Sequence, residues 1–347
     1  LGMIDTSQKA GIMIDTSQKG GIMIDTSQKG GIMIDTLQKG GLMIAIKECA
    51  SGTVGGITQV LVGQPFNTVK VRLQTQPIPI PGQPPLYSSM LDCVRKTSKE
   101  GFSAFYKGTT MPLVGIGACV SIQFAVLEHM KRYFNKVNER NGNKNSLLTN
   151  SQFFMSGAAA GIANSVISGP VEHIRTRLQV QITPTQSNSS AKKSMLYSGP
   201  IDCIKKIYSS HGIRGIYKGQ MMTMVREFHG YGTYFFLYEF LKRSDGYGKN
   251  PRGIESWKSY LFGALAGYGM WLIIYPLDIV KSKIQTDGFT PQTRKYKGAL
   301  DCFSRTYRYE GLRGFFKGFG TVMLRAGPVN ASTFMAYELA MKGFDKL

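Results

Sequence analysis

The chain repeats one pattern three times, at intervals of 105 and 106 residues. In each copy a Gly-x3-Gly pair begins 13 residues before a proline, and these prolines are Pro65, Pro170 and Pro276. Each proline opens a cluster of polar and charged residues, and a glutamine ends the pattern. A period near 100 residues is too long for a solenoid unit, so each copy is a small structural module.

Long uncharged stretches place these modules in a membrane. Each stretch is about 20 residues or longer, enough to cross a bilayer as a helix. Two further stretches carry charges near their middles. The four uncharged stretches are 50–69, 109–127, 147–171 and 259–277, and the two others are 220–238 and 318–337. We therefore predict an all-α membrane protein with six spans, two per repeat. A soluble helical protein with a loosely packed core is the alternative.

The net charge of +21 belongs to the repeats, because the first 45 residues contain four Asp and four Lys. The basic residues lie between the uncharged spans, as in Arg95-Lys96 and Lys205-Lys206. Anionic lipid head groups attract basic segments beside membrane spans, whereas nucleic-acid binding favours a basic face interleaved with stacking aromatic residues. We expect a lipid environment and no nucleic acid.

Residues 1–40 are four near-perfect copies of one decapeptide. Each copy carries an Asp, a Lys and a Gln, so none can cross a membrane. We interpret 1–45 as an extension without a role in the chemistry, either disordered or the artefact of a recent duplication. A β-arcade or an interaction tail is the alternative. The repeats then occupy 46–145, 146–250 and 251–347.

Between its two spans each repeat has a short amphipathic stretch, which begins near Tyr87, Tyr197 and Tyr296. Each stretch ends in aromatic-Lys-Gly, a boundary that suits interfacial anchoring or a phosphate head group on exposed helix amides. One cysteine lies at the same position of each stretch, in Asp92-Cys93, Asp202-Cys203 and Asp301-Cys302. No C-x2-C pair exists, so we expect buried thiols and neither zinc nor redox chemistry.

The three proline clusters, Pro65-x4-Lys70, Pro170-x4-Arg175 and Pro276-x4-Lys281, together with the three aromatic-Lys-Gly ends, resemble the mitochondrial carrier family over residues 46 to about 345. The resemblance implies six tilted helices and three short matrix helices around a pseudo-threefold axis. It also implies one substrate site at mid-membrane with a gate on either side, and a monomer in the mitochondrial inner membrane with cardiolipin as a bound lipid.

The resemblance assigns a matrix gate to the proline clusters. It pairs Glu172 with Lys281 and Asp278 with Lys70. Asn67 stands where the family has an acid, so Arg175 faces a weaker polar contact. One helical turn beyond the bases lie three glutamines that can brace the pairs. The matrix gate therefore comprises Asn67, Lys70, Glu172, Arg175, Asp278, Lys281, Gln74, Gln179 and Gln285.

The resemblance assigns a cytoplasmic gate to the ends of the second span of each repeat. It pairs Glu128 with Lys242 and Glu338 with Lys131, and leaves Glu239 without its usual partner because Met341 stands where a base is expected. Both gates are weaker than a complete network of three pairs.

Arg226, Glu227 and Arg325 are the predicted substrate residues. Each lies 12 or 13 positions before the acid that ends its span, roughly 18–20 Å along a helix and so near mid-bilayer. A charge at that depth indicates function. An arginine fork holds a carboxylate, and Glu227 can hold an ammonium group. Gln123, Asn330 and Thr333 are weaker candidates, and His229 is a candidate for proton coupling or a packed neutral side chain.

These residues predict transport of a zwitterion. The combination of an Arg-acid pair with a further Arg resembles the amino-acid and carnitine branch of the family. We expect an amino acid such as glutamate, glycine or a basic amino acid, moved by alternating access, and rank carnitine second. A proton leak and a basic scaffold protein are further alternatives. No nucleophile–base pair or metal cluster is visible in the sequence, so an enzyme is not expected.

Overall fold

The computed structural model describes residues 39–78, 84–142, 148–181, 197–245 and 256–345. The decapeptide copies in 1–38 lie outside the described residues. Helix α2 begins at Lys39, so it includes the last residues of the predicted extension 1–45.

Each repeat consists of a long helix, a short helical segment and a second long helix. The first repeat holds α2 (Lys39–Thr75), α3 (Met90–Lys99), the 3-10 helix η2 (Phe102–Tyr106) and α4 (Thr110–Arg140). The second holds α5 (Asn150–Val180), α6 (Pro200–Ile216) and α7 (Gln220–Ser244). The third holds α8 (Ser256–Thr286), α9 (Ala299–Gly314) and α10 (Phe319–Asp345). The described part of the chain contains no strand, in agreement with the prediction of an all-α protein.

The first long helix of each repeat contains the repeated proline, since Pro65, Pro170 and Pro276 lie inside α2, α5 and α8. Helix α5 begins with a capping box, in which Thr149 Oγ1 accepts from the Gln152 amide and Gln152 Oε1 accepts from the Thr149 amide. This exchange satisfies two of the amide groups that a helix start leaves without partners.

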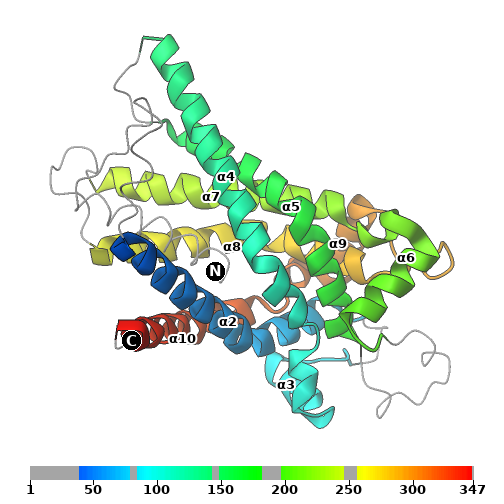
Figure 1. The fold of residues 1–347 in the computed structure, drawn as a ribbon. Coiled ribbons are helices and arrows are strands. Elements are labelled where there is room, and N and C mark those ends of the chain that lie inside the picture. The colour runs from blue at the N-terminus through cyan, green and yellow to red at the C-terminus, as the bar shows by residue number, and fades with distance from the viewer. Residues whose placement is uncertain (1–38, 79–83, 143–147, 182–196, 246–255, 346–347) are drawn as a thin grey trace. The chain divides into compact units, whose positions relative to one another are not determined.

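The chain divides into two compact units. In the larger unit, Gln64–Met323, α4 packs on α5, α5 packs on α7, and α7 packs on α8 (Figure 1). The smaller unit joins Leu1–Gly63 to Leu324–Leu347. Within it, a Cβ placed on Gly55 would lie 3.4 Å from the Thr333 carbonyl oxygen, so the backbones of α2 and α10 approach closely.

Apolar side chains form exposed stripes on the long helices. On α8, Leu261, Leu265, Tyr268 and Leu272 are all exposed, at spacings of three and four residues. This spacing places them on one face of the helix. Because a soluble protein rarely leaves a contiguous apolar face uncovered, the stripe indicates contact with lipid.

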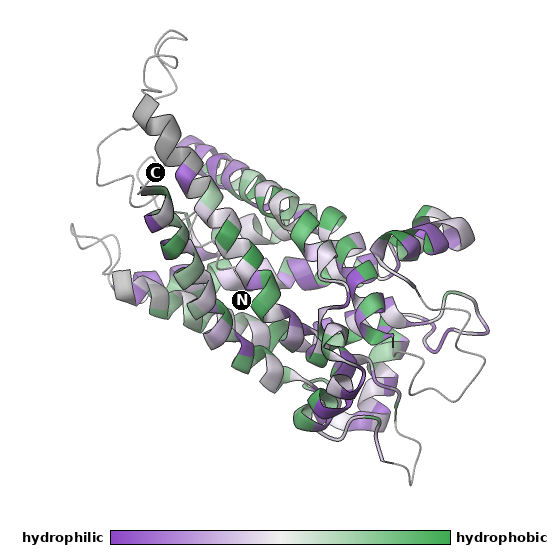
Figure 2. Ribbon diagram, turned by 60° about the horizontal axis from the view of Figure 1, so that its bottom comes forward, coloured by the Kyte–Doolittle hydropathy of each residue, from purple (hydrophilic) through white to green (hydrophobic). Residues whose placement is uncertain are grey.

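Length and composition alone do not establish all six predicted spans. Within the described residues Leu261–Thr286 is long and apolar enough to cross a membrane. The pair Phe102–Gly115 and Gly117–Arg140, bent by 47°, counts as a second if it is one span. The other long helices are less apolar because Gly, Ser, Thr and Gln occupy many of their positions, and Figure 2 shows this mixture of polar and apolar residues.

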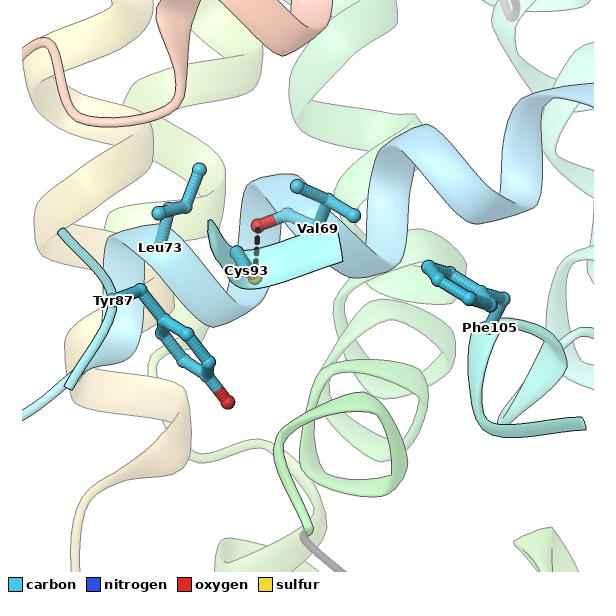
Figure 3. Packing of buried hydrophobic residues seen from close by; sticks show 5 residues of the cluster. All are labelled: Val69, Leu73, Tyr87, Cys93 and Phe105. Atoms are coloured by element: carbon cyan, nitrogen blue, oxygen red, sulfur yellow. Dashed lines mark hydrogen bonds between the residues drawn. The ribbon is translucent and has the colours of Figure 1, made fainter. Parts of the chain in front are cut away.

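A small core joins the short helix of each repeat to the long helix before it. In the first repeat Val69 and Leu73 of α2 pack with Tyr87, Cys93 and Phe105, and Cys93 Sγ lies 4.0 Å from the Val69 carbonyl oxygen (Figure 3). Cys203 and Cys302 are buried in the corresponding cores of the other two repeats. Burial raises the pKa of the Cys93 thiol to about 11, so these thiols are packing groups, as the sequence predicts.

Candidate functional site

The matrix-gate residues converge where α2, α5 and α8 pass their prolines. Lys281 of α8 forms an ion pair with Glu172 of α5, and Lys70 Nζ of α2 lies 2.6 Å from Asp278 Oδ2 of α8. Both pairs that the resemblance implies are thus present. Each joins two different helices, and the four side chains are largely shielded from solvent. Shielded ions are costly unless they pair, so the pairs hold these helices together.

Arg226 of α7 extends this cluster. The sequence predicts Arg226 as a substrate residue but does not predict its contacts with the matrix gate. Its Nη2 lies 3.1 Å from Glu172 Oε1, its Nε lies 3.8 Å from Asp278 Oδ1, and it also pairs with the neighbouring Glu227. Adding Arg226 and Glu227 gives three bases and three acids. Spacing along α7 places Arg226 only along the helix axis, and contact with α5 and α8 is decided by packing.

At the third position of the matrix gate, Arg175 reaches Gln64 of α2. Arg175 Nη2 donates to Gln64 Oε1 at 2.5 Å, one turn before Asn67 on α2. Gln64 is fully buried, and its Nε2 donates to the Lys107 carbonyl oxygen at 3.0 Å. A side chain held at both ends is a better-placed acceptor than the half-buried Asn67, so a neutral contact through Gln64 stands where the family has an acid.

The three glutamines each reach a neighbouring helix. Gln74 Nε2 donates to Asp278 Oδ2 at 3.0 Å and braces the Lys70 pair directly. Gln179 Nε2 donates to Thr68 Oγ1 at 3.2 Å, and Gln285 Nε2 to Thr223 Oγ1 at 3.4 Å. Gln74 therefore contacts a gate ion pair directly, whereas Gln179 and Gln285 contact threonines whose hydroxyl groups donate to backbone carbonyl oxygens.

An aromatic ring adds a further contact to the matrix gate. Lys70 Nζ lies 4.6 Å from the centroid of the Trp271 ring, one turn of α8 before Tyr275. A cation over an indole face is stabilised by the ring quadrupole. Trp271 lies five residues before the repeated Pro276, and its sequence surroundings do not indicate contact with Lys70.

The predicted substrate residues fall into both units. Arg226 and Glu227 lie together in the larger unit, where Gln123 of α4 is also buried, and its Nε2 has no partner within the described residues. His229 lies on the exposed side of α7 with Nδ1 2.9 Å from the Val225 carbonyl oxygen, so the structure does not bring it to Glu227.

Arg325, Asn330 and Thr333 lie in the smaller unit, on α10. The Arg325 side chain lies against Gly63 of α2, since a Cβ on Gly63 would be 3.0 Å from Arg325 Nε. That Nε and Asn330 Oδ1 have no hydrogen-bond partner within the described residues. Thr333 Oγ1 donates to the Val329 carbonyl oxygen of its own helix.

The cytoplasmic-gate residues of the larger unit make contacts within their own helices. Glu128 Oε1 lies 2.9 Å from Lys131 Nζ of α4, and Glu239 Oε1 lies 3.3 Å from Arg243 Nε of α7. Lys242 Nζ lies 5.3 Å from the Tyr238 ring centroid. Glu128 therefore has a local partner, and Glu239, whose usual partner is replaced by Met341, pairs locally with Arg243. Glu338 lies in the smaller unit.

Comparison with known proteins finds the same threefold division. The family described as "Mitochondrial carrier protein" matches residues 44–138, 147–246 and 253–346. The glutamate/glycine mitochondrial carrier of Schizosaccharomyces pombe is 49% identical over 84% of this chain and 92% of its own length.

Two further relatives are similar over most of their length. The mitochondrial glycine transporter of Saccharomyces cerevisiae is 43% identical over 86% of this chain and 91% of its own length. The human mitochondrial carnitine/acylcarnitine carrier is 37% identical over 86% of this chain and 94% of its own length.

Proposed function

This chain belongs to the mitochondrial carrier family, and from that premise we propose that it moves an amino acid or a closely related zwitterion by alternating access. Carriers of this family are multi-pass proteins of the mitochondrial inner membrane, and so is this one. We further propose six tilted transmembrane helices around a central cavity. The long-short-long order of each repeat and the exposed apolar stripe on α8 support that arrangement.

The observation that carries the proposal is the shielded Arg226–Glu227 pair on α7. A zwitterion can insert into such a pair, because its carboxylate replaces Glu227 as the partner of Arg226 and its ammonium replaces Arg226 as the partner of Glu227. The net charge of the cluster does not change. No ion is left unpaired in a site of low dielectric, where an unpaired ion is costly.

The same geometry supports coupling between binding and the matrix gate. Arg226 also holds Glu172 and Asp278, the two acids of that gate. A substrate carboxylate competes with both acids for one guanidinium, so binding weakens the contacts that hold α5 and α8 to α7. A ligand shifts a conformational equilibrium only by its differential affinity for the two states, and this competition supplies that difference.

The substrates for which the relatives are named favour a small amino acid as the substrate of this carrier. Those at 43 and 49% identity are named for glycine or for glutamate and glycine, and the human relative at 37% is named for carnitine and acylcarnitine. We therefore propose glycine or glutamate as substrate, with carnitine as the alternative.

Cardiolipin as a bound lipid of a monomeric carrier is a further proposal. Gly108, Gly219 and Gly318, which end the aromatic-Lys-Gly motifs, have φ of 78°, 80° and 79° and precede the starts of α4, α7 and α10. Helix starts with exposed amides suit phosphate groups. Native mass spectrometry of the purified carrier tests both statements, and a dimer or a lipid-free monomer at full activity contradicts them.

Uptake into proteoliposomes tests the function. We expect saturable counter-exchange of glycine or glutamate. We expect Arg226→Ala to lower it by roughly 10- to 150-fold, since a hydrogen-bonded charge contributes about 1.5–3 kcal/mol. Arg226→Lys keeps the charge but loses the fork, and we expect an intermediate rate. The control is Arg305→Ala, which removes an exposed arginine of α9 paired with Asp301.

Normal amino-acid uptake by Arg226→Ala contradicts the site. Uptake of carnitine but of no amino acid supports the alternative substrate. Conductance without saturable exchange supports a leak protein instead.

A further inference from the structure

Helices α5 and α7 touch through the Gly-x3-Gly pair of the second repeat. A Cβ on Gly157 would lie 2.6 Å from the Tyr231 carbonyl oxygen, and one on Gly161 would overlap the Glu227 carbonyl oxygen. These glycines therefore bring the backbone of α5 against the turn of α7 that carries Glu227. Because the contacts run in opposite directions along the two helices, the residue one turn beyond Gly161 faces the α7 turn just before Glu227, and its side chain leans back toward Glu227.

Asn164 occupies that position. It is three residues beyond Gly161, fully buried, and its side chain lies next to the Glu227 carboxylate. Nevertheless, neither Oδ1 nor Nδ2 has a hydrogen-bond partner of good geometry within the residues that the structure describes. A buried amide without partners costs free energy, so its presence in mid-helix requires an explanation.

Neighbouring polar side chains show what a structural role looks like on this helix. Ser156 Oγ donates to the Gln152 carbonyl oxygen at 2.7 Å, and Ser165 Oγ donates to the Ile162 carbonyl oxygen at 2.6 Å. Both hydroxyl groups are satisfied by their own helix. Asn164 is not, and Ser168 one turn on also has an unpartnered Oγ within the described residues. Asn164 and Ser168 lie three and seven residues beyond Gly161, so the unpartnered groups lie on the face of α5 that packs on α7.

We propose that Asn164 is a specificity-determining residue of the ammonium subsite, an inference that rests on the proposed function. When a substrate carboxylate draws Arg226 away, Glu227 and Asn164 Oδ1 together present acceptors to the substrate nitrogen. A primary ammonium has three N–H donors to fill them. In that substrate-bound state the Asn164 amide nitrogen also donates to Glu227 and holds its carboxylate in place.

This subsite discriminates between two classes of zwitterion. A primary α-amino acid supplies N–H donors to Asn164, whereas a quaternary ammonium compound supplies none and leaves the buried amide unpartnered. A site built to hydrogen-bond a substrate group rejects the analogue that lacks it far more strongly than an apolar site does. Asn164 therefore selects primary amino acids against trimethylammonium zwitterions of the same length.

Two competing substrates in proteoliposomes test the inference, namely glycine and N,N,N-trimethylglycine. We expect Asn164→Leu, which is similar in volume, to lower glycine uptake on the order of 10- to 100-fold. Uptake of trimethylglycine should stay constant or rise, so that the selectivity ratio falls. Ser156→Ala is the control, because it also removes a buried polar group from α5 but lies eight residues before Asn164 along the helix, and its ratio should equal that of the wild type.

Thermal unfolding separates this role from a structural one. Because Asn164→Leu removes an unpartnered amide, we expect an unfolding temperature equal to or above that of the wild type. If Asn164→Leu does not fold, Asn164→Ser gives the same comparison of uptake ratios. An unchanged ratio in the folded variant overturns the inference and leaves the proposed function standing. Absence of amino-acid uptake by the wild type overturns the proposed function itself.

Discussion

The two gates of the larger unit differ in which helices their ion pairs join. At the matrix gate, Lys281 pairs with Glu172 and Lys70 with Asp278, and each pair crosses from one helix to another. At the cytoplasmic gate, Glu128 pairs with Lys131 three residues away on the same helix. Pairs that cross between helices resist separation of those helices, and local pairs do not.

The side chains of the two gates also differ in how far they are exposed to solvent. The Glu172 side chain is 20% exposed and its partner Lys281 is 4% exposed, whereas Glu128 is 43% exposed. Ion pairs in water contribute little, and buried ones are strongly destabilised when one partner is removed. In the larger unit, the acids and bases of the predicted matrix gate are therefore paired across helices, whereas the α4 acid of the predicted cytoplasmic gate pairs within its own helix.

The largest expected effect comes from neutralising the matrix gate. Glu172→Gln leaves Lys281 shielded without its carboxylate and removes one partner of Arg226. We expect destabilisation of about 3–5 kcal/mol, which thermal unfolding in detergent will measure. Exchanging the charges, Glu172→Lys with Lys281→Glu, should restore part of the loss. If Glu172→Gln unfolds at the wild-type temperature, the pair does not hold the helices.

A smaller effect is expected from Trp271. Replacing it by Leu removes the ring that lies 4.6 Å from Lys70 Nζ but leaves the ion pair with Asp278 intact. We expect a loss of about 0.5–2 kcal/mol from the closed matrix gate. Labelling of a cysteine introduced at Thr68, which is fully buried, should then be faster than labelling of the same cysteine in a protein that retains Trp271. Trp271→Phe keeps an aromatic face and should label at an intermediate rate.

The smallest effect is expected at the other gate. Glu128→Gln is the same chemical change as Glu172→Gln but removes only an exposed local pair. We expect about 0.2–1 kcal/mol in unfolding experiments. Its effect on transport reports a different quantity, the stability of the state in which the cytoplasmic gate closes. A loss of stability as large as that of Glu172→Gln would contradict the difference between the matrix gate and the cytoplasmic gate.

Much of the fold follows from local sequence signals. The spacing of Gly-x3-Gly, proline and glutamine is a property of the chain alone, and it predicts three copies of one helical module. The buried cysteines of the short helices were predictable for the same reason, because Cys93, Cys203 and Cys302 recur at one position of an amphipathic pattern. The charged residues near the ends of the helices were equally visible. Two of the ion pairs that the family resemblance implies, Glu172–Lys281 and Asp278–Lys70, are present in the structure.

Contacts between helices followed from no local signal. Nothing in the sequence near Arg226 indicates that it reaches Glu172 and Asp278, and nothing near Arg175 indicates that it donates to Gln64. Spacing along a helix fixes the depth of a side chain, but its partners depend on how closely and at which turn two helices pack.

The sequence by itself determined the threefold repeat and the all-helical modules, and it predicted which ionisable residues lie at depth in the membrane. The tertiary structure alone decided which acid meets which base, and that Asn164 lies unpartnered beside Glu227. The physical reason is the range of the interactions. Helix formation and amphipathic patterning act over a few residues, whereas ion pairs and buried amides depend on residues more than fifty positions apart.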